Sequence, residues 1–154
     1  MIDFTAPGQR YIRCAGTLGW AFPASIGVKC ALPDKPVLCF TGDGGFYYYL
    51  SELETAARLA INLVVVVNNN RSLQQVKNIV DTSYGGNPEA KGQELWVFRE
   101  TNFARIAENM GCLGLRVERP GDIRSALKQA LQADGPVVID VVTDIGALPQ
   151  APWT

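Results

Sequence analysis

The sequence predicts an α/β fold: a doubly wound, mostly parallel sheet of five to six strands with helices on both faces. Short apolar runs alternate with segments in which apolar residues recur at helical spacing, and this alternation favours parallel strands joined by crossover helices. Two runs, Val37–Thr41 and Leu63–Val67, are almost wholly apolar, which is typical of strands buried on both faces. The length of 154 residues is near the usual size of one core, so we expect residues 1–154 to form a single domain.

The elements up to the second of these runs can be placed in order. Tyr11–Cys14 is expected to be a short first strand, and Leu18–Leu32 a helix interrupted near its start by Pro23. Leu63–Val67 ends directly in Asn68-Asn69-Asn70. Between the two apolar runs, a helix of roughly 14 residues is predicted from the spacing of apolar or small residues. These residues are Phe46, Tyr49, Leu50, Leu53, Ala56, Ala57 and Ala60.

The second half of the chain begins with a polar segment, Arg71–Leu95, which contains several Gly and Pro residues. It is expected to be a short helix and then a long loop, and loops of that length are usually functional or disordered. Asn102 is a plausible N-cap for a helix ended by Gly111. The remaining expected elements are helix Phe103–Met110, strand Leu113–Val117, helix Asp122–Gln132, a closing strand Val137–Val142 and an irregular tail Leu148–Thr154.

Gly42-Asp43-Gly44-Gly45, followed by Asn69-Asn70, is the most informative motif of the chain. Asp43 comes directly after one predicted strand and Asn70 directly after the next. The helix between them rises about 21 Å, and a strand of about six residues returns over nearly the same distance. A right-handed crossover places the two strands parallel and close together. The carboxylate and the carboxamide are therefore expected to meet at the carboxyl edge of the sheet, where open α/β folds bind ligands.

This meeting point suits a magnesium ion bound together with a diphosphate. Magnesium prefers octahedral oxygen ligands and combines a few protein oxygens with phosphates and water. Asp43 offers an anionic oxygen, Asn70 a neutral one, and a backbone carbonyl just after Asn70 a third. The glycines beside Asp43 let the backbone approach a phosphate, and the helix expected to begin near Phe46 directs its positive end there. The alternative is an ordinary GDGG turn and a polar strand exit, but the order of motif, helix, strand and asparagines favours the cofactor site.

One stretch of the chain resembles the cofactor signature of thiamine diphosphate enzymes, a GDG followed by a double Asn: GDGGF…LSELETAARLAINLVVVVNNN. AGTLGWAFPASIGVKCALPDKPVLCFTGDGGF resembles the pyrophosphate-binding domain of the acetolactate synthase and pyruvate decarboxylase superfamily, and the resemblance runs from about Tyr11 to Asp144. It implies that Asp43 and Asn70 ligate Mg²⁺ through their side chains and that the backbone carbonyl of Ser72 is the third protein ligand. Because three Asn are consecutive, the 27-residue separation from Asp43 selects Asn69-Asn70 as the pair.

Gly16-Thr17-Leu18-Gly19 matches the family's turn beneath the aminopyrimidine of the cofactor. By resemblance, Leu18 wedges between the two cofactor rings and enforces a bent conformation, and the carbonyl of Gly16 accepts a hydrogen bond from the pyrimidine amino group. The bend brings that amino group next to the reactive thiazolium carbon, and such proximity lowers barriers by roughly 7–11 kcal/mol in the best intramolecular cases. The alternative is that the glycines only shape a tight turn and that Leu18 belongs to the core. Ahead of GDGG, a cofactor-binding role is favoured for Gly16, Thr17 and Leu18.

The family's active site also requires a pyrimidine-binding domain, whose glutamate starts ylide formation, and no such second domain fits in this chain. The resemblance implies a site shared with a pyrimidine domain of the same or a neighbouring subunit, in a complete enzyme that is a homodimer or a tetramer. We therefore expect half a site here, with no catalytic residue of its own and no turnover by the chain alone. A small subunit of a split 2-oxo acid decarboxylase and an excised C-terminal domain both remain open.

The expected function is to bind the Mg-diphosphate end of thiamine diphosphate in a lyase or ligase that acts on a 2-oxo acid or an acyl donor. A non-catalytic assembly domain is the alternative, and the intact Asp43, Asn70 and GDGG argue against it. In acetolactate synthases the segment after the double Asn reads Gly-Met-Val and then Gln-Trp, whereas here Gln75 and Ile79 stand at the Met and Trp positions. This departure leaves cofactor binding intact but argues against acetolactate formation. Gln75 is a candidate substrate contact or, equally, a polar residue of a solvated helix.

The amino-acid composition argues against several classes of binding partner and of catalytic site. With 47% hydrophobic residues and a net charge of −1, neither nucleic acid nor an anionic membrane surface is an expected partner. No apolar run approaches the ~20 residues that span a bilayer, and no secretory signal is visible. The chain has no histidine, so Ser-His and Cys-His nucleophiles are excluded within it. The four cysteines lack paired metal spacing and are expected to be reduced core residues, which indicates a cytoplasmic location: Cys14, Cys30, Cys39 and Cys112.

Overall fold

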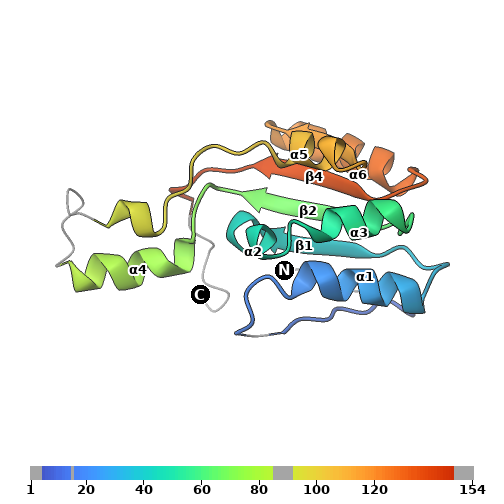
Figure 1. The fold of residues 1–154 in the computed structure, drawn as a ribbon, viewed down its shortest axis with the longest axis horizontal. Coiled ribbons are helices and arrows are strands. Elements are labelled where there is room, and N and C mark those ends of the chain that lie inside the picture. The colour runs from blue at the N-terminus through green and yellow to red at the C-terminus, as the bar shows by residue number, and fades with distance from the viewer. Residues whose placement is uncertain (1–4, 15, 85–91, 148–154) are drawn as a thin grey trace.

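The fold is a parallel sheet with helices on both faces (Figure 1), which confirms the predicted α/β class. The structure is a computed structural model that describes residues 5–14, 16–84 and 92–147. Within these ranges the strands are β1 (Leu38–Gly42), β2 (Val64–Asn69), β3 (Leu113–Val117) and β4 (Val137–Val142). The α-helices are α1 (Ala21–Ala31), α2 (Asp43–Tyr48), α3 (Glu52–Arg58), α4 (Gln74–Ser83), α5 (Phe103–Asn109) and α6 (Ile123–Leu131), and the 3₁₀ turns are η1 (Gln93–Leu95) and η2 (Pro120–Asp122).

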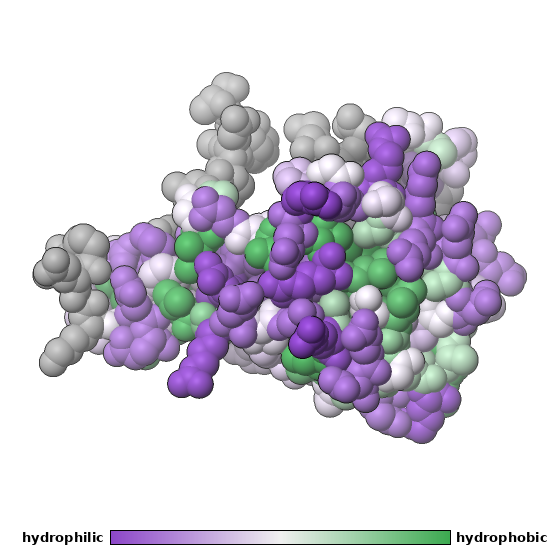
Figure 2. Space-filling model, turned by 90° about the horizontal axis from the view of Figure 1, so that it is seen from above, coloured by the Kyte–Doolittle hydropathy of each residue, from purple (hydrophilic) through white to green (hydrophobic). Residues whose placement is uncertain are grey.

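Each face of the sheet has its own hydrophobic core. On one face, Phe46 of α2 lies between Phe22 of α1 and Phe103 of α5, with ring centroids 5.3 and 5.5 Å apart. On the other face, α6 packs Ala126 and Ala130 against β2 and β4. Helix α4 and η1 lie beyond the carboxyl ends of the strands, at the left of Figure 1. Seen from above, hydrophilic residues predominate on the surface and hydrophobic residues show between them (Figure 2).

The prediction of five to six strands was too high, because the described residues contain four, in the order β1-β2-β4-β3. Residues 11–14, expected to be the first strand, have no regular secondary structure. The side chains of Tyr11 and Ile12 are 64% and 60% exposed, so this segment has no buried face to fix it in a sheet register. Strand β4 was expected to close the sheet, but it lies between β2 and β3 and pairs in parallel with both.

The helix predicted after GDGG was placed and sized wrongly. It begins at Asp43, not near Phe46, and it is divided into α2 and α3. At the division, the amide of Tyr49 donates to the carbonyl of Phe46 and the amide of Glu52 to that of Tyr49, so the chain turns more tightly than an α-helix there. Phe46 and Leu53 are nevertheless both fully buried in the same core. The apolar spacing therefore identified the buried face but not the break.

Several local predictions are confirmed. The Asn102 side chain caps α5 by accepting a hydrogen bond from the amide of Arg105 at 2.9 Å, and Gly111 follows the helix with φ +84°. The polar segment after β2 forms α4 and η1, while the Gly/Pro-containing residues 85–91 lie outside the described residues, as does the tail 148–154. None of the helices in the described part of the chain has the length and hydrophobicity needed to cross a membrane.

The four cysteines differ in their exposure to solvent. Cys39 and Cys112 are buried, and desolvation raises the pKa of Cys39 to about 11, so this thiol remains protonated at neutral pH. Cys14 and Cys30 are exposed, so the expectation that they belong to the core was wrong. Residues 11–14 make no strand and Cys30 lies at the solvent side near the end of α1, which explains the difference.

Candidate functional site

Asp43 lies at the carboxyl edge of the sheet, directly after β1. The register pairs Gly42, the last residue of β1, with Asn68 of β2, so the chain leaves both strands at the same level. The two carboxylate oxygens of Asp43 accept hydrogen bonds from backbone amides: Oδ1 from Gly44 at 2.7 Å and Oδ2 from Ser72 at 3.1 Å. The second bond joins the GDGG segment to the turn that follows Asn70.

The Asp43 carboxylate is almost completely buried. The residue is only 2% exposed, and desolvation raises the pKa of its carboxyl group although the backbone hydrogen bonds lower it. Among the described residues, no lysine or arginine forms an ion pair with it. A buried anion with this environment favours binding of an external cation, because unpaired buried charge is unfavourable.

Asn70 and Ser72 stand in the same turn as the Asp43 contact. The Ser72 hydroxyl lies 3.0 Å from Oδ1 of Asn70 and 3.0 Å from Oε1 of Gln74, and since it has one hydrogen it donates to one of them at a time. Arg71 between them adopts φ +60°, the left-handed region, and its carbonyl accepts from the amide of Phe98 at 2.7 Å. This conformation turns the amide of Ser72 back toward Asp43.

The three consecutive asparagines have three different partners. Asn68 Oδ1 accepts from the Thr143 hydroxyl at 2.9 Å, and Asn69 Nδ2 donates to Asp140 and to the carbonyl of Thr101. Only the Asn70 side chain is hydrogen-bonded within the turn that reaches Asp43. Alternation of side chains along a strand places Asn69 on the opposite face from Asn68, and Asn70 follows the end of β2.

The turn at residues 16–19 lies against the GDGG segment. Gly16 and Gly19 have φ +84° and +87°, and a Cβ on Gly19 would lie 2.9 Å from the carbonyl oxygen of Gly45. A Cβ on Gly45 would lie 3.5 Å from Cδ1 of Leu18, so the two predicted cofactor-binding segments adjoin. Thr17 and Leu18 are exposed, with Leu18 at 49%, so Leu18 is not a core residue of this chain.

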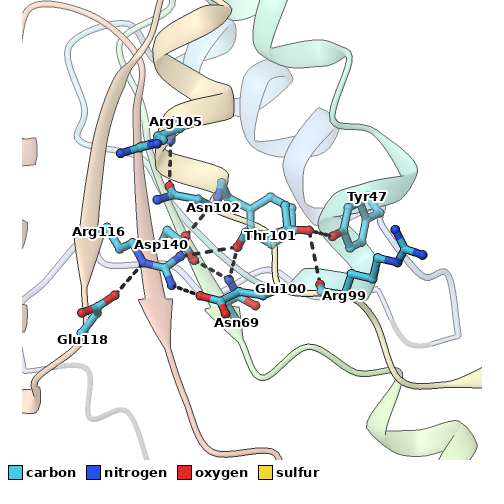
Figure 3. Close-up of polar contacts among 11 residues, drawn as sticks. Tyr47, Asn69, Arg99, Glu100, Thr101, Asn102, Arg105, Arg116, Glu118 and Asp140 are labelled. Atoms are coloured by element: carbon cyan, nitrogen blue, oxygen red, sulfur yellow. Dashed lines mark hydrogen bonds and ion pairs between the residues drawn. The ribbon is translucent and has the colours of Figure 1, made fainter. Parts of the chain in front are cut away.

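A cluster behind this site was not identified from the sequence. It comprises Asn69, Thr101, Phe103, Arg116 and Asp140, hereafter the Asp140 cluster (Figure 3). Burial lowers the pKa of the Arg116 guanidinium, but the hydrogen bond to Glu118 and the charge of Asp140 outweigh it and raise the pKa. The available signal in the sequence was the single charged residue inside the apolar run VVIDVV.

In the described residues no three His, Cys, Asp or Glu side chains gather as a metal site. A metal ion bound near Asp43 would therefore need amide or carbonyl oxygens as further ligands.

Comparisons with known proteins agree with this geometry. Residues 2–141 match the family described as "Thiamine pyrophosphate enzyme, C-terminal TPP binding domain". The chain is 36% identical over 138 residues to a probable acetolactate synthase large subunit of Methanococcus aeolicus, covering 84% of this chain and 21% of that protein. It is 36% identical over 132 residues to the acetolactate synthase isozyme 3 large subunit of Escherichia coli (strain K12), covering 84% and 22%.

Among solved structures, the thiamine diphosphate-dependent 4-hydroxybenzoylformate decarboxylase of Rhodococcus jostii RHA1 superposes with a TM-score of 0.71 at 30% identity, covering 82% of this chain and 23% of that one. The chain spans about a fifth of the length of the curated relatives it matches. Family match, relatives and fold agree, and the chain belongs to the thiamine pyrophosphate enzymes, as their C-terminal, TPP-binding domain.

Proposed function

We propose that this chain is the diphosphate-binding part of a thiamine diphosphate-dependent lyase or ligase acting on a 2-oxo acid or an acyl donor. Asp43 and Asn70 hold Mg²⁺ through their side chains, and the backbone carbonyl of Ser72 supplies a third ligand. One carboxylate, one carboxamide and one carbonyl are the hard oxygen donors that Mg²⁺ takes together with phosphate oxygens and water.

The buried Asp43 carboxylate is the observation that carries this proposal. It lies at the carboxyl edge of a parallel sheet, it is bonded to the turn that contains Asn70 and Ser72, and no described side chain neutralises it. The carboxyl edge is where α/β sheets of this kind bind ligands. A divalent cation would compensate the negative charge without moving the backbone amides that already orient the carboxylate.

The neighbouring residues fit a diphosphate and its attached rings. Gly42 has open space at its Cβ position, so a phosphate group can approach the backbone beside Asp43. Gly44 and Gly45 are packed against Leu73, Thr41 and Leu18, and they hold the residues 16–19 against the start of α2. Leu18 remains exposed next to this segment, available to contact the cofactor rings. When bound, the cofactor supplies the carbanion-stabilising chemistry, and this chain anchors and orients it.

We propose that a pyrimidine-binding domain, from the same or a neighbouring subunit, completes the site. The chain matches only about a fifth of its relatives' length. Two hydrophobic side chains, Leu18 beside the GDGG segment and Tyr48 at the end of α2, are 49% and 64% exposed. A homodimeric or tetrameric complete enzyme would provide such a surface. Gln75, exposed at the start of α4, is our candidate contact for the substrate. We propose a cytoplasmic location, in keeping with four cysteines that lack paired metal spacing in the sequence.

Calorimetric titration with Mg²⁺ and thiamine diphosphate tests the proposal, with and without a separately supplied pyrimidine-binding domain. We expect metal-dependent binding by the unsubstituted chain and its loss in Asp43→Ala. Asp134→Ala, an exposed carboxylate before β4 at the opposite end of the sheet, is the matched control and should bind normally. Turnover of a 2-oxo acid is expected only with the second domain present. Absence of binding under every condition would instead support an assembly domain that has kept the fold without the cofactor.

A further inference from the structure

We propose that Asn69, held by Asp140, is a positioning residue for the metal-binding turn at residues 70–72. Asn69 would not touch the metal or the cofactor; it would fix the place at which the chain leaves β2, and with it the ligand positions of Asn70 and Ser72. The inference rests on the proposed function, because it assigns that turn to metal binding.

The amide group of the Asn69 side chain is hydrogen-bonded behind the site. It is 3% exposed, and the two hydrogens of its amide group go to Asp140 Oδ1 at 2.8 Å and to the carbonyl of Thr101 at 2.9 Å. The backbone carbonyl of Asn69 accepts from the amide of Thr143 at 2.9 Å. Both the side chain and the main chain at this position are therefore fixed, one residue before Asn70.

Asp140 is itself held in place by two further donors. Its Oδ2 accepts from the amide of Phe103 at 3.0 Å and from Nη1 of Arg116 at 2.9 Å, and the residue is completely buried. Arg116 also binds Glu100 and Glu118 at 3.0 and 2.9 Å, so its guanidinium is anchored on three sides (Figure 3). The contacts from Asn69 to β4, to the start of α5 and to β3 thus form one connected set of hydrogen bonds.

Residues 96–101, which include the Thr101 carbonyl that accepts from Asn69, also bond directly to the turn at residues 70–72 and the residue after it. The carbonyl of Arg71 accepts from the amide of Phe98 at 2.7 Å, and the amide of Leu73 donates to the carbonyl of Trp96 at 2.8 Å. Further along, the Thr101 hydroxyl accepts from the Tyr47 hydroxyl of α2, the helix that begins with Asp43 (Figure 3). Residues 96–101 therefore connect the metal-binding turn, Asn69 and α2, and a shift at Asn69 would be transmitted to both ligand-bearing segments.

The neighbouring residue Ile139 offers a control on the opposite face of β4. Its side chain is 1% exposed and packs in the core under α6, not in the Asp140 cluster. Ile139→Val and Ile139→Ala lower stability to two different extents without removing any hydrogen bond of Asn69. They separate loss of stability from loss of position.

Two measurements on the full chain test the inference. The first is hydrogen exchange of the Ser72 and Gly44 amides, which donate to Asp43 and report the turn geometry without any ligand. The second is titration with Mn²⁺ and thiamine diphosphate followed by the electron paramagnetic resonance spectrum of bound Mn²⁺, which takes the same oxygen ligands as Mg²⁺. Partners that orient metal ligands indirectly typically change metal affinity 10–100-fold when removed.

In Asn69→Ala we expect the Ser72 amide to exchange at least tenfold faster relative to the amides of β2, Mn²⁺ affinity to fall about tenfold, and the spectrum to broaden. Asn69→Ser, which retains one donor, should fall between Asn69→Ala and the unsubstituted chain, and it serves if Asn69→Ala does not fold. Ile139 variants of equal thermal stability should retain exchange, affinity and spectrum. Equal behaviour of the Asn69 and Ile139 variants at matched stability would overturn the inference. Failure of the unsubstituted chain to bind Mn²⁺ with thiamine diphosphate, both alone and with a pyrimidine-binding domain supplied, would overturn the proposed function instead, and the exchange of Ser72 would still decide whether Asn69 positions the turn.

Discussion

Replacing Asp43 by Asn removes the buried negative charge and almost preserves the side-chain shape. In the unsubstituted chain without metal, desolvation raises the folded-state pKa of Asp43 above its usual value of 3.8. Between these two pKa values the folded chain binds a proton that the unfolded chain has released, so stability decreases as pH rises through that window and then levels off. Asp43→Asn should lose this part of the pH dependence.

Ligand binding provides the larger and more decisive difference. At a ligand concentration 100 times the dissociation constant, binding to the folded state stabilises it by about 2.7 kcal/mol. For a domain near 150 residues, each kcal/mol shifts the unfolding temperature by about 2–4 °C, so we expect a rise of roughly 5–11 °C with Mg²⁺ and thiamine diphosphate. Asp43→Asn should show almost none of this rise. In the absence of ligand its stability reflects opposing effects, because the lost charge is favourable whereas an amide hydrogen facing a backbone N–H costs about 1–3 kcal/mol.

The assay is thermal unfolding of both proteins between pH 3.5 and 8, with and without Mg²⁺ and thiamine diphosphate. Mg²⁺ alone and thiamine diphosphate alone are the controls for incomplete ligand. Asp134→Ala, far from the site, should behave as the unsubstituted chain does. An equal ligand-induced rise in Asp43→Asn would refute the reasoning, because a site that tolerates loss of its only carboxylate is not the metal site proposed.

Three further predictions concern the scaffold. Gly114→Ala would place a Cβ 2.1 Å from the carbonyl oxygen of Ala104, a backbone atom, so the free energy of unfolding in urea should fall by at least about 1–3 kcal/mol. Gly27→Ala, on the open side of α1, should raise it by about 0.5–1 kcal/mol. Similar effects of the two changes would contradict the packing of α5 on β3. Arg71→Gly relieves a left-handed conformation that costs a non-glycine residue about 1–2 kcal/mol, so its thermal stability should not fall, whereas that of Arg71→Val should. Asn102→Ala removes the cap of α5 and should lower the free energy of unfolding by about 0.5–2 kcal/mol, and an unchanged urea midpoint would show that the cap contributes nothing.

The parallel strands and the meeting of Asp43 with the turn after β2 were predictable because they depend on local patterns. Apolar runs of strand length between helical segments define the β1–α2–α3–β2 unit, and the geometry of a crossover then fixes where its ends lie. Residues 11–14 show the limit of this reasoning. Four residues with two bulky apolar side chains look like a strand in sequence, but strand formation also requires a neighbouring edge and a face to bury.

The Asp140 cluster was not predictable for a different reason. Its members come from β2, β3, β4, the first residue of α5 and Thr101 before that helix, so no spacing along the chain relates them. A lone aspartate in an apolar strand indicates a buried charge, but it does not indicate which arginine neutralises it. The break between α2 and α3 was missed likewise, since both segments keep their apolar residues on the same face.

Two buried carboxylates at the same end of the sheet have opposite electrostatic situations, and this contrast carries the functional argument. Asp140 is completely buried and is neutralised within the chain by Arg116. Asp43 is 2% exposed, receives only backbone amides, and forms no ion pair in the described part of the chain. A buried charge that lacks its partner destabilises a fold by several kcal/mol. If Asp43 had only a structural role, a lysine or arginine beside it would therefore stabilise the fold. Among the described residues there is such a cation for Asp140 but not for Asp43, and this is why we propose that a metal ion compensates the charge of Asp43.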